Sequence, residues 1–261
     1  MLIFWDNELD IAEGSFKLAC ELDPKNSEAH KEYAWLLDRT GRYAEALVEA
    51  KRASEADSNS IEAHYVFFYI YRHLGLYDDA IATYKTITGL NPQYPWSYTE
   101  AAFTYILTKA YDKAESVVRE GLQIDSTHNG LKNHLAWALA KKGELEKALT
   151  IYQETGFKAG AGWVLGLMNK EEQVLAVVEE LKTGEQTDDW WTAWNISFIY
   201  QALEQAEQAL DWLEQAGNKI KEQSPLQEND FGWRLSVDPE YDDLRSDERF
   251  QKIIEKTGYE K

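Results

Sequence analysis

The sequence predicts an all-α fold, an α-solenoid in which antiparallel helix pairs stack on one another. Residue types recur every 34 positions along much of the 261-residue chain, as in the step from Ala46 to Ala80. Pro, which breaks helices, is scarce, with five in the whole chain. Units that bury one face only against their neighbours produce such a period. We therefore expect a stack of helix pairs that ends in a C-terminal capping helix.

Four series of positions share this period, and each residue type has a physical reason. A small residue lets two helices cross closely. A glycine adopts the left-handed conformation that ends a helix. A tyrosine at the start of the second helix fills the space between hairpins, and a further aromatic series lies on the first helix. The small residues are Ala46, Ala80, Ala114 and Ala148, and the glycine series is Gly41, Gly75, Lys109 and Gly143. The tyrosine series is Tyr43, Tyr77, Tyr111 and Leu145, and the further aromatic series is Trp35, Tyr69, Phe103 and Trp137.

This pattern resembles the tetratricopeptide repeat (TPR) family. Phe68 departs from it, because a small residue is usual at that position. The residues that carry the match in 61–94 are Gly75, Tyr77, Ala80, Tyr84 and Pro92. The resemblance implies a right-handed TPR superhelix that binds a protein or peptide partner and has no catalytic role.

The register divides the chain into a TPR array over 1–221 and a C-terminal loop with a capping helix over 222–261. The array opens partway along a first helix, and its spacing shortens after Tyr152, which makes the next unit degenerate. We expect the chain to be the C-terminal array of a larger protein. A partial first repeat precedes the units 27–60, 61–94, 95–128, 129–154, 155–189 and 190–221.

The tail predicts one more amphipathic helix. Ser246 is expected to be its N-cap, with acidic residues in the first turn. Gly258 is expected to end it. This helix would cover the open end of the stack, as solenoid caps do. Its apolar stripe consists of Phe250, Ile253 and Ile254.

The segment 237–250 is similar to the end of bacterial TPR arrays that are attached to adenylate-cyclase-like or winged-helix regulatory domains. That resemblance implies an alternative function, a regulatory or self-assembly segment of a larger signalling protein whose N-terminal effector domain is absent here. The incomplete first repeat adds an exposed face, so a homo-oligomer through this repeat is a further possibility.

Charge and composition exclude several partners. The net charge of −19 repels nucleic-acid phosphates, so we expect no nucleic-acid binding. The sequence has no apolar run of about 18 residues, so no membrane insertion is expected. Cys20 is the single cysteine, which rules out an internal disulfide and fits a reducing compartment. A cytoplasmic location follows as an expectation.

No residue pattern indicates catalysis. The histidines show no metal-ligand spacing, so neither a metal nor a cofactor is expected. We interpret Cys20 as a buried structural thiol, because no base is paired with it in the sequence. The glycines of 160–166 lack the spacing and the preceding strand of a phosphate-binding loop, and close helix packing explains them better. The chain is therefore not expected to be an enzyme.

The resemblance implies that the first helix of each pair lines a concave groove. Every full unit places an aromatic residue on that side. Two interpretations stay open: the rings pack between adjacent first helices, or they remain partly exposed as a ladder for a peptide. The candidate partner-binding residues are Trp35, Tyr65, Tyr69, Arg72, Trp96, Phe103, Trp137, Trp163, Trp194 and Phe198.

Overall fold

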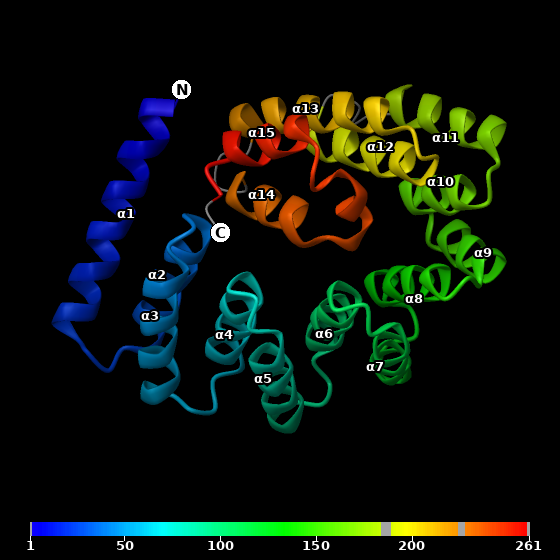
Figure 1. Ribbon diagram of the computed structural model, residues 1–261. Helices are drawn as coiled ribbons and strands as arrows, with labels where there is room; N and C mark the ends of the chain where they lie inside the picture. Colours follow the sequence, from blue (N-terminus) through cyan, green and yellow to red (C-terminus); the bar gives the residue numbers. More distant parts are fainter. Residues whose placement is uncertain (1, 184–188, 224–227, 260–261) are drawn as a thin grey trace. The chain divides into compact units, whose positions relative to one another are not determined.

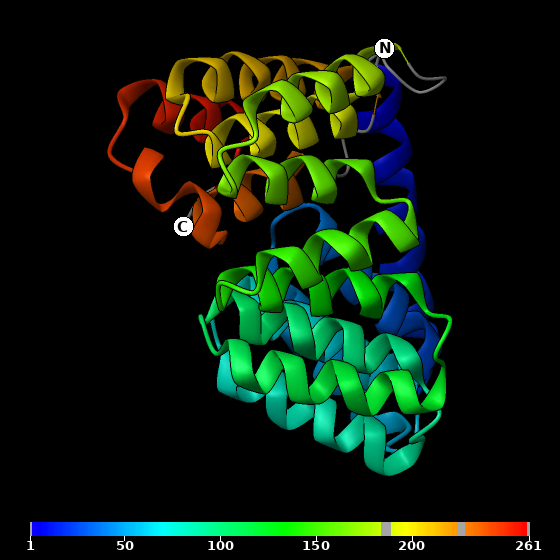
Figure 2. The same ribbon diagram turned by 90° about the vertical axis from the view of Figure 1, so that its right-hand side faces the viewer.

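The computed structural model describes residues 2–183, 189–223 and 228–259. These described residues contain helices and no strand (Figures 1 and 2). The chain forms two compact units, Met1–Ser97 and Tyr98–Lys261. No helix within the described ranges has the length and apolar character that crossing a membrane requires.

The first unit consists of antiparallel helices joined by short turns. Its last helix, α6, begins in this unit and continues into the second. The helices are α1 (Leu2–Leu22), α2 (Ser27–Arg39), α3 (Tyr43–Ala56), α4 (Ile61–His73), α5 (Tyr77–Leu90) and α6 (Pro95–Leu107).

The second unit continues the pairs and ends in a tail that contains a short 3-10 helix, η2. Its further elements are α7 (Tyr111–Ile124), α8 (Asn129–Lys141), α9 (Leu145–Thr155), α10 (Lys158–Leu167), α11 (Glu171–Thr183), α12 (Trp190–Ala202), α13 (Ala206–Gln223), α14 (Glu228–Val237), η2 (Pro239–Leu244) and α15 (Glu248–Lys256).

The turns inside the pairs follow the predicted 34-residue step. Gly41, Gly75 and Gly143 have φ values of 76°, 72° and 84°, and Lys109 takes the same left-handed conformation at 58°. In the first of these turns, Gly41 N–H donates to Asp38 O. Such hydrogen bonds satisfy carbonyls at the end of a helix. The period therefore located the turn at Lys109 even though the residue is not glycine.

The alanine series lies where the helices of a pair meet. Ala46, Ala80, Ala114 and Ala148 are all 0% exposed. A larger side chain at these positions would separate the two helix backbones. The buried alanines confirm the predicted role of this series.

The glycines of α10 are sites of close packing. A Cβ atom added at Gly160 would lie 2.6 Å from the Tyr152 ring, and one at Gly162 would lie 2.7 Å from Ile199 Cδ1. A Cβ atom added at Gly166 would lie 2.8 Å from Ala202 Cβ. These distances are shorter than van der Waals contact, so only glycine fits without a shift. The packing interpretation of 160–166 is confirmed.

The tail folds back on the last helix pair, where α14 and α15 contact α13 and η2 contacts α12 (Figure 1). Phe250 and Ile253 of α15 are buried in the same apolar cluster as residues of α13. The prediction of Ser246 as the N-cap was wrong. The Asp247 carboxylate caps α15 instead and accepts from the N–H groups of Arg249 and Phe250 at 2.7 and 3.1 Å.

Candidate functional site

Three of the candidate aromatic residues form a cluster on the first helices of unit one. Trp35 of α2 lies 5.1 Å from Tyr69 of α4 between ring centroids, and Tyr65 lies 5.2 Å from Tyr69. All three side chains are half-buried. We call Trp35, Tyr65 and Tyr69 the first aromatic surface. Each ring packs on a neighbour and still keeps part of its area exposed.

The other two candidates of unit one have different environments. Arg72 is fully buried, and its guanidinium carbon lies 4.5 Å from the centroid of the Tyr69 ring. This cation–π contact holds the Tyr69 ring in place. Trp96, at the start of α6, is 53% exposed.

A second set of candidates forms a continuous row across α6, α8, α10 and α12. Phe103 and Trp137 are 6.0 Å apart between centroids, and Trp137 lies 6.2 Å from Trp163. Phe198 lies 5.6 Å from Trp163 and 5.8 Å from Trp137. We call Phe103, Trp137, Trp163 and Phe198 the second aromatic surface. One residue of each first helix contributes to it.

The tail of the chain lies on this second aromatic surface. The Arg234 guanidinium of α14 stands 5.1 Å from the ring centroid of Phe103 and 5.6 Å from that of Trp194. The Trp233 ring packs edge-on against Phe103 at 6.5 Å. These contacts combine the large apolar area of the rings with the attraction of a cation to their faces.

η2 also contacts the second aromatic surface, at Phe198 and Trp137. Tyr241 is buried against the Phe198 ring, and its hydroxyl lies 3.0 Å from Ser197 Oγ. Trp137 Nε1–H donates to the Glu240 carboxylate at 3.3 Å, and Lys141 forms an ion pair with the same carboxylate at 2.9 Å. Sequence reasoning assigned the tail to the end of the stack and did not place it here. The available signal was the Trp233-Arg234 pair followed by the acidic segment 238–243.

A cavity of about 290 Å³ remains between the second aromatic surface and the tail. Trp194, Arg234 and Asp238 line it together with the four rings. Asp238 is 2% exposed, and its pKa is raised to about 7, first because burial disfavours the charged carboxylate and then because Glu240 repels it. Aromatic walls with a few polar groups are typical of ligand pockets.

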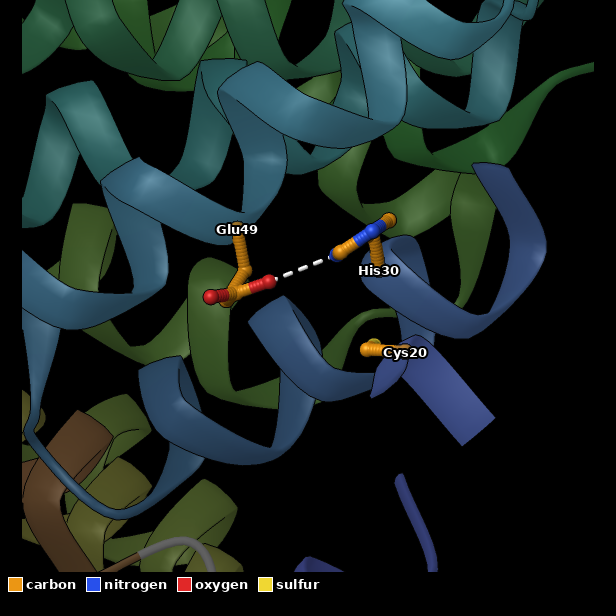
Figure 3. A group of neighbouring side chains, drawn as sticks. All are labelled: Cys20, His30 and Glu49. Carbon is orange, nitrogen blue, oxygen red and sulfur yellow. Dashed lines mark hydrogen bonds and ion pairs between the residues drawn. The ribbon is translucent and has the colours of Figure 1, made fainter. Parts of the chain in front are cut away.

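A separate group of side chains in unit one joins three helices (Figure 3). Cys20 of α1, His30 of α2 and Glu49 of α3 place one potential metal-ligand atom each within 4.8 Å of the others. His30 and Glu49 are buried, and Cys20 is half-buried. Burial, followed by the nearby Glu49 carboxylate, raises the pKa of the Cys20 thiol. The thiol alone is therefore a poor nucleophile at neutral pH.

The sequence missed this group because its members are not close in the chain. Spacing motifs find ligands on one helix or loop, and these residues come from three helices. The repeat positions do not reveal it either. The positions of Cys20, His30 and Glu49 are those of Ser54, His64 and Thr83 in the next repeat, 34 residues on.

Comparison with known proteins supports the repeat interpretation directly. Tetratricopeptide repeat family models match residues 15–48 and 62–94. The helix pairs and these matches define the chain as a TPR solenoid by fold. The search of curated proteins found no match.

Three solved structures have a similar fold at low identity. A tetratricopeptide repeat protein from Parabacteroides merdae ATCC 43184 has a TM-score of 0.70 and 17% identity, over 97% of this chain and 93% of its own. The pilF protein of Pseudomonas aeruginosa has a TM-score of 0.54 and 13% identity, over 76% and 92%. A thermophilic TPR protein of Thermus thermophilus has 0.50 and 18%, over 77% and 95%. The comparisons do not support the finer resemblance of the tail to cyclase-like or winged-helix proteins.

Proposed function

We propose that this chain is a non-catalytic scaffold that binds a protein or peptide segment on the aromatic face of its first helices. TPR proteins in general mediate protein–protein interactions. The observation that carries the proposal is the tail of the chain itself. In unit two a segment of polypeptide already lies on this face and contacts the repeated aromatic position in two helices through Phe103 and Phe198.

The contacts of the tail indicate which chemistry suits such a face. Arg234 lies against two rings, and Trp233 and Tyr241 pack on Phe103 and Phe198. Aromatic side chains give large contact area at low entropic cost, and cations gain from the ring faces. The net charge of −19 also favours a basic partner. We therefore expect a partner segment that contains aromatic and basic residues.

The first aromatic surface is our candidate for the partner site. Trp35, Tyr65 and Tyr69 are half-buried, so each ring keeps area for a ligand. On the second aromatic surface the tail contacts Phe103, Trp137 and Phe198. A partner segment would take the place of the tail on Phe103, Trp137 and Phe198 only after it displaced the tail.

The experiment selects binding peptides from a random display library with the intact chain as bait. Fluorescence anisotropy then measures Kd for a selected peptide. The Trp35→Ala/Tyr69→Ala double variant should weaken binding at least about tenfold, because aromatic truncations at contact centres commonly cost more than about 1 kcal/mol. Val48→Ala is the matched control, since Val48 is 51% exposed on α3, a second helix. Circular dichroism verifies that both variants keep their helices.

Two outcomes contradict this assignment. One is unchanged affinity in the Trp35→Ala/Tyr69→Ala variant. The other is an equal loss in the Val48→Ala control, which would place the peptide on the second helices. A library that yields no binder at all would count against the scaffold function itself.

Self-assembly is a second candidate function, favoured by the surface of α1. Ile11, Leu18 and Leu22 are 61%, 54% and 78% exposed. Their spacing of 7 and 4 residues places them on one helix face. An apolar face of this kind is a typical site of association between chains.

A further inference from the structure

We propose that Cys20, His30 and Glu49 form a binding site for a divalent transition metal, with Zn²⁺ as the best match. Thiolate sulfur, imidazole nitrogen and carboxylate oxygen are the three ligand types that zinc uses in proteins. Here one of each comes from α1, α2 and α3, with the donor atoms within 4.8 Å of one another. Figure 3 shows the Glu49 and His30 side chains pointing toward each other, with Cys20 beside them.

The contacts of His30 favour a cation in this position. Nε2 lies 3.2 Å from the Pro24 carbonyl oxygen, and Nδ1 lies 2.6 Å from Glu49 Oε2. Both neighbours are hydrogen-bond acceptors, whereas neutral imidazole carries a single N–H. With that N–H donated to Pro24, the Nδ1 lone pair faces the Glu49 carboxylate. A backbone carbonyl on the second nitrogen is a usual arrangement for a metal-bound histidine.

A proton on Nδ1 is the competing explanation. His30 would then be an imidazolium paired with Glu49, and Cys20 would take no part. Metal binding requires the Cys20 thiolate and the ion pair does not, so replacing Cys20 distinguishes the two explanations.

A zinc site here requires rotations of the ligand side chains. Bond lengths of about 2.0–2.3 Å and tetrahedral angles place zinc donor atoms about 3.3–3.6 Å apart. The Nδ1–Oε2 separation of 2.6 Å must widen, and the sulfur, with its partners within 4.8 Å, must move inward by side-chain rotation. Glu49 is already oriented, because its other oxygen, Oε1, accepts from Arg52 at 2.6 Å.

The surroundings leave space for a further ligand beside the three side chains. A cavity of about 580 Å³ lies against the three side chains, and Lys17, Glu21 and Arg52 also line it. Binding would release the Cys20 thiol proton to solvent and place thiolate, imidazole and carboxylate on the metal. A water molecule would take the fourth position. Because the three ligands come from three helices, the metal would also fix α1 to the first full pair.

The neighbouring repeat provides a matched control. His64 stands at the repeat position of His30, and its Nε2 lies 3.0 Å from the Ser58 carbonyl oxygen, as the His30 ring does with Pro24. The residues at the other two positions are Ser54 and Thr83. A histidine of the same local structure is therefore present without the thiol and the carboxylate.

The test titrates the intact, chelator-treated chain with Co²⁺, whose bond to a thiolate gives a charge-transfer absorption band. We expect saturation at one equivalent, displacement by Zn²⁺, no band in Cys20→Ser, and at least about tenfold weaker binding in His30→Ala and Glu49→Gln. His64→Ala should bind as the original chain does. Circular dichroism checks that each variant folds.

A second measurement is independent of cobalt. A ligand that binds only the folded state raises Tm. Zn²⁺ should therefore raise Tm of the original chain and of His64→Ala, but not of Cys20→Ser. The proposal is overturned if the original chain gives no thiolate band. It is also overturned if Cys20→Ser keeps both the affinity for Zn²⁺ and the rise in Tm, which would show that the Cys20 thiol is not a metal ligand.

Discussion

At the scale of single residues, the left-handed turns show over which part of the chain the 34-residue period predicts structure. The 34-residue step located Lys109 because its position agrees with Gly41, Gly75 and Gly143. After the spacing shortens, Asn169 and Glu204 take the same conformation at φ 55° and 56°. Neither is glycine, and neither stands at a multiple of the period. A residue outside the repeat, with no glycine to mark it, could not be predicted from the sequence.

Asp238 gives a prediction about pH. Its pKa rises from the usual 3.8 to about 7 in the folded chain. A carboxyl whose pKa is raised by folding binds more protons in the folded state, so its contribution to stability is present at low pH and is lost as pH rises. The free energy of unfolding should therefore fall between about pH 4 and pH 7 because of this group. Glu240, Arg234 and Lys141 set its electrostatic environment.

The measurement is denaturant unfolding of the original chain and of Asp238→Asn at about pH 5 and pH 8, on either side of the raised pKa. The amide keeps an oxygen that can accept from Glu240 N–H, a bond of 3.0 Å, but it does not titrate. Stability of the original chain relative to Asp238→Asn should drop on going to the higher pH. The other carboxyl groups are present in both proteins, so their contributions to the pH dependence cancel in the difference. A relative stability that stays constant, or rises with pH, contradicts the assignment.

At the scale of elements, the sequence predicted α15 and its buried stripe but not the place of α14 and η2. The stripe of α15 is a local pattern, since Phe250 and Ile253 lie one turn apart. The position of α14 depends on rings far away in the chain, because Arg234 lies on Phe103 and Trp194. Composition and spacing contain no information about which of ten tryptophans meets which partner. The aromatic face was therefore predicted, and its occupant was not.

The packing of α10 gives a prediction about one glycine. Gly162→Ala places a Cβ 2.7 Å from Ile199 Cδ1 and 3.0 Å from Val177 Cγ1. Overpacking at such a contact costs about 1–3 kcal/mol, more than the roughly 0.5–1 kcal/mol that alanine gains in helix propensity, so the free energy of unfolding should fall. The control is Gly14→Ala in the interior of α1, where a Cβ meets nothing within 4 Å.

Gly14→Ala should instead raise stability by about 0.5–1 kcal/mol, because alanine has the higher helix propensity. Denaturant unfolding followed by circular dichroism measures both variants. If Gly162→Ala proves as stable as Gly14→Ala, α10 does not pack against α12 as described.

At the scale of the whole molecule, net charge and exposed apolar surface have opposite effects on association between copies of the chain. A net charge of −19 keeps copies apart, and salt screens that repulsion over about 8–10 Å. The exposed face of α1, formed by Ile11, Leu18 and Leu22, acts in the other direction. Apolar burial does not depend on charge, so added salt should shift the balance toward association.

We therefore predict that the chain self-associates through α1, and more strongly at high salt. Light scattering after size exclusion, over a range of protein concentrations and at low and high ionic strength, measures the mass. Leu18→Glu/Leu22→Glu should remain monomeric under all conditions, because association would bury two new charges. Leu175→Glu is the control, since Leu175 is 46% exposed on α11. A mass that stays monomeric at high concentration and high salt contradicts the prediction. Equal dissociation by the control would mean that net charge, and not the α1 face, determines assembly.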